Sequence, residues 1–235
     1  MWVALAALAG VLAVCSACGG GTDIDESASK TAITPEAQEQ AESMILQLSD
    51  FPNGWRGSAP EDDENDEAFR KCIGVDYSSL TRTGAAESRD FAMGESTEAS
   101  SSAAVFANEQ QAEDYLEEFS AGMNGNEVEG CLQELVEENA EGDSTFKVGE
   151  VDVGEFNVTP PNVEDAAAWQ LVVPVEITSG VGEGLTPSLY LEDVILRQGD
   201  KVATIETSDV LTEFDPDLRD KLIQTVAGRM SDASG

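Results

Sequence analysis

The chain has 235 residues, of which 47 are acidic and 12 basic, and it contains no histidine, so its formal net charge is −35. A chain this acidic repels the phosphates of nucleic acids, and we expect no nucleic-acid partner. Without histidine it cannot form a Ser-His-Asp triad, a Cys-His pair or a zinc site that uses histidine. Hydrophobic residues make up 41% of the chain, enough for a folded domain with a core.

The first 17 residues form an apolar run that ends in small residues. This pattern is typical of a secretory signal, and the run is short for a membrane-spanning helix, which needs about 20 residues. Two small residues precede Cys18, an arrangement that resembles a bacterial lipobox, in which the cysteine becomes the lipidated first residue of the mature protein. Cys15 is the rival site, but the bulky Val14 precedes it. We predict a signal peptide over 1–17, lipidation of Cys18 and a flexible tether over 18–34.

A first helix is predicted to begin at Pro35, after a threonine N-cap, because apolar residues recur there at helical spacing. It ends before the segment SDFPNGW, residues 49–55, where Pro, Asn and Gly form a turn. The two aromatics of this segment, Phe51 and Trp55, are expected in the core, and ligand stacking by Trp55 is the alternative. The acidic residues 57–69 lack the glycine of a calcium loop and are predicted to form a solvated loop.

Two strands are predicted next, over residues 89–93 and 100–106. Asn108 then caps a helix with one apolar face. A break at 124–126, Asn-Gly-Asn, separates this helix from a second one, whose apolar face includes Cys131.

After Gly142 the hydrophobic period changes from about 3.6 to 2, which predicts strands. The alternation slips at residues 149–150, which indicates a β-bulge. The clearest alternation runs over residues 169–177. Pro174 within it cannot donate to a strand ladder, so this strand, or its Pro174 side, is expected at a sheet edge.

Two further strands, 188–197 and 201–207, are joined by a Gln-Gly-Asp hairpin, and Asp215 caps a last helix. This order of elements predicts a single α+β domain over 35–230. We expect a twisted antiparallel sheet of about five to six strands, with helices packed on one face and a C-terminal helix. Residues 231–235 are predicted to form a disordered tail.

Two cysteines lie in the predicted domain, Cys72 and Cys131. An even pair in an exported chain is expected to form a disulfide. A pair of free thiols, or a metal-binding pair, is the alternative. The disulfide would close a loop of about 60 residues, to which the chain-entropy model assigns roughly 4 kcal/mol of stabilisation.

The lipobox, the segment 49–55, the two cysteines, the hairpin at 197–200 and the C-terminal helix together resemble a known family. The chain is similar to small actinobacterial lipoproteins related to the extracellular sensor domain of a membrane serine/threonine kinase, whose architecture is loosely PsbP-like. The resemblance implies a twisted antiparallel sheet with helices around it, a cleft for a cell-envelope ligand and no catalysis. Because those sensor domains carry two disulfides and this domain can form only one, the ligand-binding residues stay unknown.

We therefore expect a lipid-anchored extracytoplasmic binding or sensor-type domain that recognises an envelope ligand or envelope protein. It would contact the membrane through its N-terminal lipid only and use no metal, cofactor or catalytic residue. The first alternative is an acidic protein–protein interaction module or accessory subunit of a membrane or wall protein. The second is a carboxylate-based hydrolase, because 47 acids provide many pairs at catalytic spacing. Ser27 and Lys30 match a penicillin-binding-protein motif, but they lie in the tether without its companion motifs.

Overall fold

The computed structural model describes residues 30–60, 66–140, 145–180 and 182–233. Its strands are β1 (Lys30–Thr31), β2 (Arg56–Ser58), β3 (Thr81–Glu87), β4 (Asp90–Met93), β5 (Thr97–Phe106), β6 (Phe146–Val148), β7 (Asp152–Glu155), β8 (Asp165–Ile177), β9 (Ser188–Gln198) and β10 (Lys201–Val210). Its α-helices are α2 (Pro35–Met44), α3 (Asp66–Ile73), α4 (Glu109–Met123), α5 (Val128–Ala140) and α6 (Pro216–Asp232). Two 3-10 turns, η1 (Leu48–Asp50) and η2 (Tyr77–Ser79), complete the elements.

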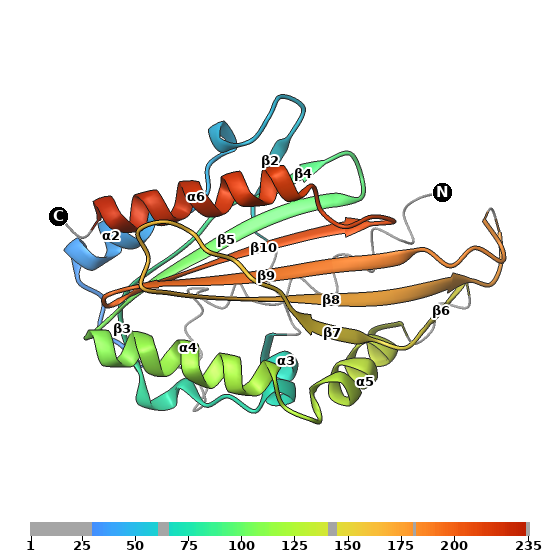
Figure 1. Cartoon of the computed structure of the whole chain (residues 1–235), viewed down its shortest axis with the longest axis horizontal. Coiled ribbons are helices and arrows are strands. Elements are labelled where there is room, and N and C mark those ends of the chain that lie inside the picture. Colours follow the sequence, from blue (N-terminus) through green and yellow to red (C-terminus); the bar gives the residue numbers. More distant parts are fainter. Residues whose placement is uncertain (1–29, 61–65, 141–144, 181, 234–235) are drawn as a thin grey trace.

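One sheet forms the centre of the molecule, and helices cover both of its faces (Figure 1). Its strands follow the order β1-β3-β5-β10-β9-β8-β6, while β4 also pairs with β5, β2 with β4 and β7 with β8. The β1–β3 pair is parallel, and the other pairs are antiparallel. The strand β10, last in the chain, thus lies between β5 and β9 and joins the two halves of the sheet.

The α+β class and the C-terminal helix are confirmed, but the sheet is larger than expected. Over the described ranges it has ten strands instead of five to six. Several of the additional strands, such as β1 and β2, have only two or three residues, too few to show a period in the sequence. The strand β3, TRTGAAE, was not predicted, because its small residues give no hydrophobic alternation.

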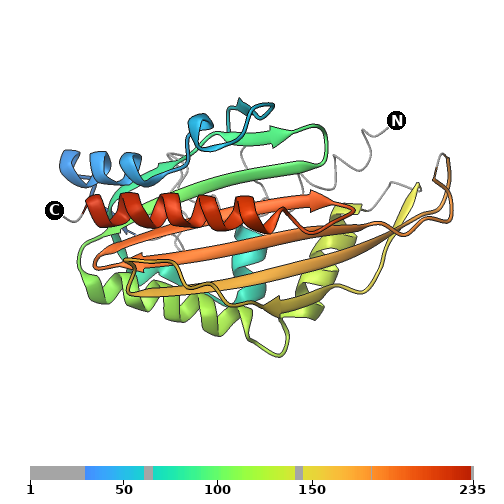
Figure 2. The same ribbon diagram turned by 45° about the horizontal axis from the view of Figure 1, so that its top comes forward.

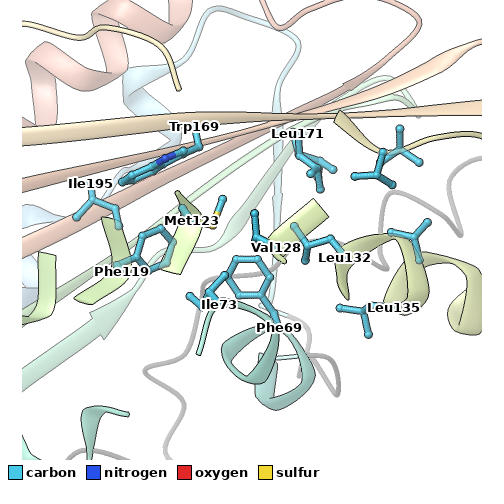
Figure 3. Packing of buried hydrophobic residues seen from close by; sticks show 14 of the residues in the cluster. Phe69, Ile73, Phe119, Met123, Val128, Leu132, Leu135, Trp169, Leu171 and Ile195 are labelled. Carbon is cyan, nitrogen blue, oxygen red and sulfur yellow. The ribbon is translucent and has the colours of Figure 1, made fainter. Parts of the chain in front are cut away.

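The expectation that helices pack on one face is wrong. Helices α3, α4 and α5 pack on one face, where Phe119 and Trp169 meet at 5.3 Å between ring centroids (Figure 3). Helices α2 and α6 pack on the other, with Trp55 and Phe91 in their core. The sequence of β10 does not reveal which face is inward, because almost every residue of this central strand is buried.

The predicted helix starts are confirmed by their caps. The Thr34 hydroxyl accepts a hydrogen bond from the N–H of Ala37, and the Asn108 side chain accepts one from the N–H of Gln111. The Asp215 carboxylate caps α6 in the same way. The solvated loop predicted over 57–69 is wrong in part, because β2 begins it and α3 ends it, and Phe69 is buried in the core; residues 61–65 lie outside the described chain.

Both edges of the sheet are closed in specific ways. On the β3 edge, the Gln38 amide of α2 donates to the carbonyl of Ala85 (2.8 Å) and accepts from its N–H (3.2 Å), as a neighbouring strand would. On the other edge, β8 meets only the short β6 and β7, which are interrupted beside Pro174. The carbonyl of Pro174 accepts from the N–H of Gly149 at 2.7 Å, at the irregularity predicted there. The predicted edge position is wrong, because β8 is paired on both sides, and Pro174 lies instead at the gap between β6 and β7.

The predicted disulfide is confirmed: Cys72 of α3 is bonded to Cys131 of α5. The signal peptide, Cys15 and Cys18, and most of the tether lie outside the described residues. Within the part that is described, no helix combines the length and the apolar character needed to cross a membrane.

Candidate functional site

A group of polar side chains interrupts the apolar sheet face that α3, α4 and α5 cover. We call this group the carboxylate–hydroxyl strip. It comes from three adjacent strands, β5, β10 and β9, and lies between the apolar side chains of Leu191 and Ile195 on β9. Its members are Glu98, Ser100, Ser102, Asp193, Thr204, Glu206 and Ser208.

The centre of the strip is one row of cross-strand neighbours. Glu206 of β10 stands opposite Ser100 of β5 on one side and Asp193 of β9 on the other. Directly opposed side chains in an antiparallel sheet have Cβ atoms about 4.5–5.5 Å apart, so the two carboxyl groups are close neighbours. The Ser100 hydroxyl lies 3.5 Å from a Glu206 carboxylate oxygen. The row continues to Trp169 of β8, which stands opposite Asp193.

The strip is largely but not fully shielded from solvent. Glu206 is 8% exposed and Ser102 is 7% exposed, whereas Ser100 and Asp193 are only partly buried. The shielding of the Asp193 carboxyl is nevertheless enough to raise its pKa from 3.8 to about 7, and the negative charge of Glu192 adds to this shift. At neutral pH the Asp193 carboxyl is thus poised between a neutral donor and a charged acceptor.

Among the strands that form the strip, the positive charges lie away from it. The cations carried by β9 and β10, Arg197 and Lys201, lie at the other end of these strands. The Arg197 guanidinium is held by Asp165 and by Glu164, and the Lys201 ammonium by Asp200 at 3.0 Å. The sheet positions of the three strip rows include no basic residue. A group that meets the strip therefore finds hydrogen-bond acceptors, hydroxyls and partial negative charge.

Glu192, the neighbour of Asp193 in sequence, points to the opposite face and is fully paired. Its carboxylate accepts from Arg219 of α6 at 2.8 Å, from Thr207 at 3.1 Å and from Gln170 at 3.2 Å. This arrangement joins α6 to the sheet and leaves no carboxylate oxygen for a ligand. We assign Glu192 a structural role.

The predicted site residues occupy separate places. Trp55 is 6% exposed and packs with its ring centroid 4.6 Å from that of Phe51, so it belongs to the core and the ligand-stacking alternative is not supported. The two domain cysteines are bonded to each other, so the alternative that they bind a metal is not supported. No group of three or more acidic or cysteine side chains suitable for a metal ion occurs in the described part of the chain.

The sequence analysis did not predict the strip, although it carries a local signal. Asp193 and Glu206 are charged residues inside strands whose other positions are mainly apolar. The two-residue turn at Gly199 and Asp200 fixes the register of the β9–β10 hairpin and so places these carboxylates opposite each other. Ser100 could not be assigned in this way, because the pairing of β5 with β10 joins distant parts of the chain.

No protein-family model matches the chain, and no curated protein matches it. Among solved structures, the extracellular domain of PknH from Mycobacterium tuberculosis is similar, with a TM-score of 0.42 and 8% sequence identity. The alignment covers 85% of this chain and 98% of that domain. This neighbour is of the kind that the sequence resemblance named, an extracellular domain of a kinase; membership of the actinobacterial lipoproteins remains a prediction. The function has to be argued from the residues of this chain.

Proposed function

We propose that the protein is a lipid-anchored extracytoplasmic domain of the binding or sensor type, and that the carboxylate–hydroxyl strip recognises a component of the cell envelope. The observation that carries the proposal is the opposed pair of Asp193 and Glu206 at the centre of the carboxylate–hydroxyl strip, beside a large apolar core cluster. Burial disfavours the charged form of the Asp193 carboxyl, whose pKa is raised to about 7, and the Glu206 carboxyl stands directly opposite it. A ligand that brings amine or hydroxyl groups beside an apolar portion would compensate these two carboxyl groups.

The extracytoplasmic location is supported by the disulfide between Cys72 and Cys131. Disulfides persist in oxidising compartments and are rare in the cytosol. The apolar N-terminal run that ends at Cys18 supports the same location and supplies the attachment point.

A carboxylate-based hydrolase is the second candidate. The pKa of Asp193, about 7, would allow it to act as an acid beside the Glu206 carboxylate, the pairing that glycoside hydrolysis uses. A sugar site also needs exposed aromatic surface for stacking, and Trp169, the aromatic of this row, is 2% exposed. We therefore place binding before hydrolysis.

The test is to recover bound molecules from the full chain after it has been exported with its own leader. The protein would be purified in mild detergent, incubated with an envelope lipid extract and analysed by native mass spectrometry. We expect a bound small molecule with the unsubstituted protein and with the control Glu138→Gln, which changes an exposed acid on α5. We expect its loss in the double variant Asp193→Asn, Glu206→Gln. Recovery of a protein and no small molecule would contradict the proposal.

Two further measurements address the alternatives. Release of sugars from purified wall polymer, abolished by Asp193→Asn, would establish the hydrolase instead. For the anchor, labelling with a clickable fatty acid should be lost in Cys18→Ala and retained in Cys15→Ala. The reverse pattern would move the lipid to Cys15.

A further inference from the structure

The sheet face that α2 and α6 cover is left open at one end. Strands β8 and β9 continue well past the N-terminal end of α6 (Figures 1 and 2). The first turns of α6 lie over Glu192, because Arg219 reaches that carboxylate at 2.8 Å. Tyr190 is the next residue of β9 on the same face and is partly exposed. The sheet positions around Tyr190 thus lie beyond the helix.

The residues gathered there are mainly apolar or aromatic. We call them the open sheet face: Met93, Val172, Pro174, Tyr190 and Leu211. Tyr190 stands opposite Val172 of β8 on one side and Asp209 of β10 on the other, and the row continues through Thr97 of β5 to Met93 of β4.

The burial of alternate residues in β8 shows that the described part of the chain covers this end only in part. Leu171, Val173 and Val175 are buried on the opposite face, while Val172 and Pro174 are partly exposed. Met93 is 45% exposed. The open sheet face is therefore a partly solvent-exposed surface on which apolar side chains lie beside the polar Thr97 and Asp209, and exposed apolar groups of this kind can mark interaction sites.

Leu211 adds an independent observation. Its φ is 96°, in the left-handed region that favours glycine, and its side chain is 52% exposed. Its N–H donates to the carbonyl of Ser188 at 2.8 Å, which places it at the end of the open sheet face. The Leu211 side chain is not buried within the chain, so intramolecular packing does not offset the strain of its backbone. Backbone strain of this kind is common at functional sites.

The charges around the face are mainly negative. Asp209 lies in the central row, Asp152 stands opposite Val172, and Glu95 is in the turn next to Met93. One basic residue at this end, Lys147, stands opposite Glu176. A second copy of this chain, which also carries a net charge of −35, would be repelled, and so would anionic lipid headgroups.

We propose that the open sheet face docks a protein segment that carries lysine or arginine residues around apolar side chains. The apolar side chains would lie on Tyr190, Val172 and Met93, and the cations would face Asp209, Asp152 and Glu95. This face lies on the other side of the sheet from the carboxylate–hydroxyl strip, so the two sites can be occupied or lost independently.

The test uses the full chain in mild detergent and an 18-residue amphipathic helix of leucine and lysine as the probe, with a leucine–glutamate helix as its counterpart. We expect binding of the lysine peptide and none of the glutamate peptide. The double variant Met93→Ser, Tyr190→Ser should weaken the Kd about tenfold. The control Leu48→Ser changes a leucine on η1 whose exposure, 48%, is similar to that of Met93, and it should leave the Kd unchanged.

The variant Leu211→Gly provides a second test of the proposal that does not depend on the double variant folding. Because glycine favours a φ of 96°, this variant should melt at a higher temperature and still bind the lysine peptide more weakly. Equal affinity of all variants would show that net charge alone holds the peptide and would overturn the proposal. Binding to zwitterionic vesicles that the double variant abolishes would overturn it in favour of a lipid surface.

Discussion

At the scale of single residues, burial affects the carboxyl groups of two neighbouring acids of β9 differently. Glu192 is compensated by an arginine, a hydroxyl and an amide. Asp193 lacks a cation in its row and responds by a higher pKa, about 7. The difference follows from the side of the sheet, because adjacent residues of a strand point to opposite faces.

The raised pKa of Asp193 predicts how stability depends on pH. The unfolded chain loses this proton near pH 3.8, whereas the folded protein keeps it until about pH 7. The folded state therefore binds more protons in this window, and the contribution of Asp193 to stability is lost as the pH rises through it. Asp193→Asn should be more stable than the unsubstituted protein above pH 7, on the order of 4 kcal/mol, with the difference vanishing near pH 4. Urea unfolding across this pH range measures it; a constant difference would contradict the assignment.

Ser101 carries a second prediction at this scale. Its buried hydroxyl accepts from the N–H of Leu46 at 2.8 Å, and its own N–H donates to the Ser88 hydroxyl at 2.9 Å. Ser101→Ala leaves the Leu46 N–H buried without an acceptor, so the free energy of unfolding should fall by about 1–3 kcal/mol. The exposed Ser43→Ala is the control and should change it by less than about 0.5 kcal/mol. Similar losses in both variants would show that Ser101 does not hold this segment.

At the scale of elements, the close packing of α2 against β3 depends on one glycine. A Cβ at Gly84 would lie 2.1 Å from the Ala37 carbonyl oxygen, in the backbone of α2. The close approach lets the Gln38 amide reach Ala85 and close the sheet edge.

Gly84→Ala should therefore push α2 away from the sheet and lower the free energy of unfolding by about 2–4 kcal/mol. Gly130→Ala is the matched control. Gly130 lies within α5, and a Cβ there meets nothing within 4 Å, so alanine should raise stability by roughly 0.5–1 kcal/mol. Chemical denaturation measures both, and effects of the same sign would contradict this account.

The disulfide joins α3 to α5 across 59 residues of sequence. Because α3 has only eight residues, it depends on this link and on Phe69 and Ile73 for its position. The double variant Cys72→Ser, Cys131→Ser should lose roughly 4 kcal/mol of stability, by the chain-entropy model. Amide hydrogen exchange should increase first in α3 and α5 while β9 and β10 stay protected. Uniform loss of protection would show that the bond stabilises the whole domain equally.

The sequence was informative where the physical signal is local. The caps at Thr34, Asn108 and Asp215 act within a few residues, so the starts of α2, α4 and α6 were predictable. The layering of helices on both faces was not, because the central strands are buried on both sides and their pattern does not alternate. The β5 members of the strip depend on pairing between distant strands, and a polar residue within a strand suggests a solvent face until its partners are known.

At the scale of the whole molecule, the dominant feature is the net charge of −35. Four of the 12 basic residues, Arg197, Lys201, Arg219 and Arg229, pair with neighbouring acids. The remaining surface repels itself, which keeps the protein dispersed and weakens the compact state.

Salt should therefore stabilise the domain. Raising the ionic strength from about 0.01 M to about 1 M shortens the Debye length from roughly 30 Å to roughly 3 Å and screens this repulsion. We expect a gain on the order of 1 kcal/mol in the free energy of unfolding, measured by urea titration, and the same gain with sodium and potassium chloride. A gain that depends on the cation would instead indicate a bound ion.

The position of β10 has a consequence for biogenesis. The earlier strands leave a gap between β5 and β9 that only the final strand fills. A polypeptide threaded outward from its first residue would hold two unfinished half-sheets until β10, Lys201–Val210, had emerged. If the protein is exported as we propose, its sheet would be completed only after β10 has crossed the membrane, and a chain truncated before β10 would expose the unpaired edges of β5 and β9 to proteases.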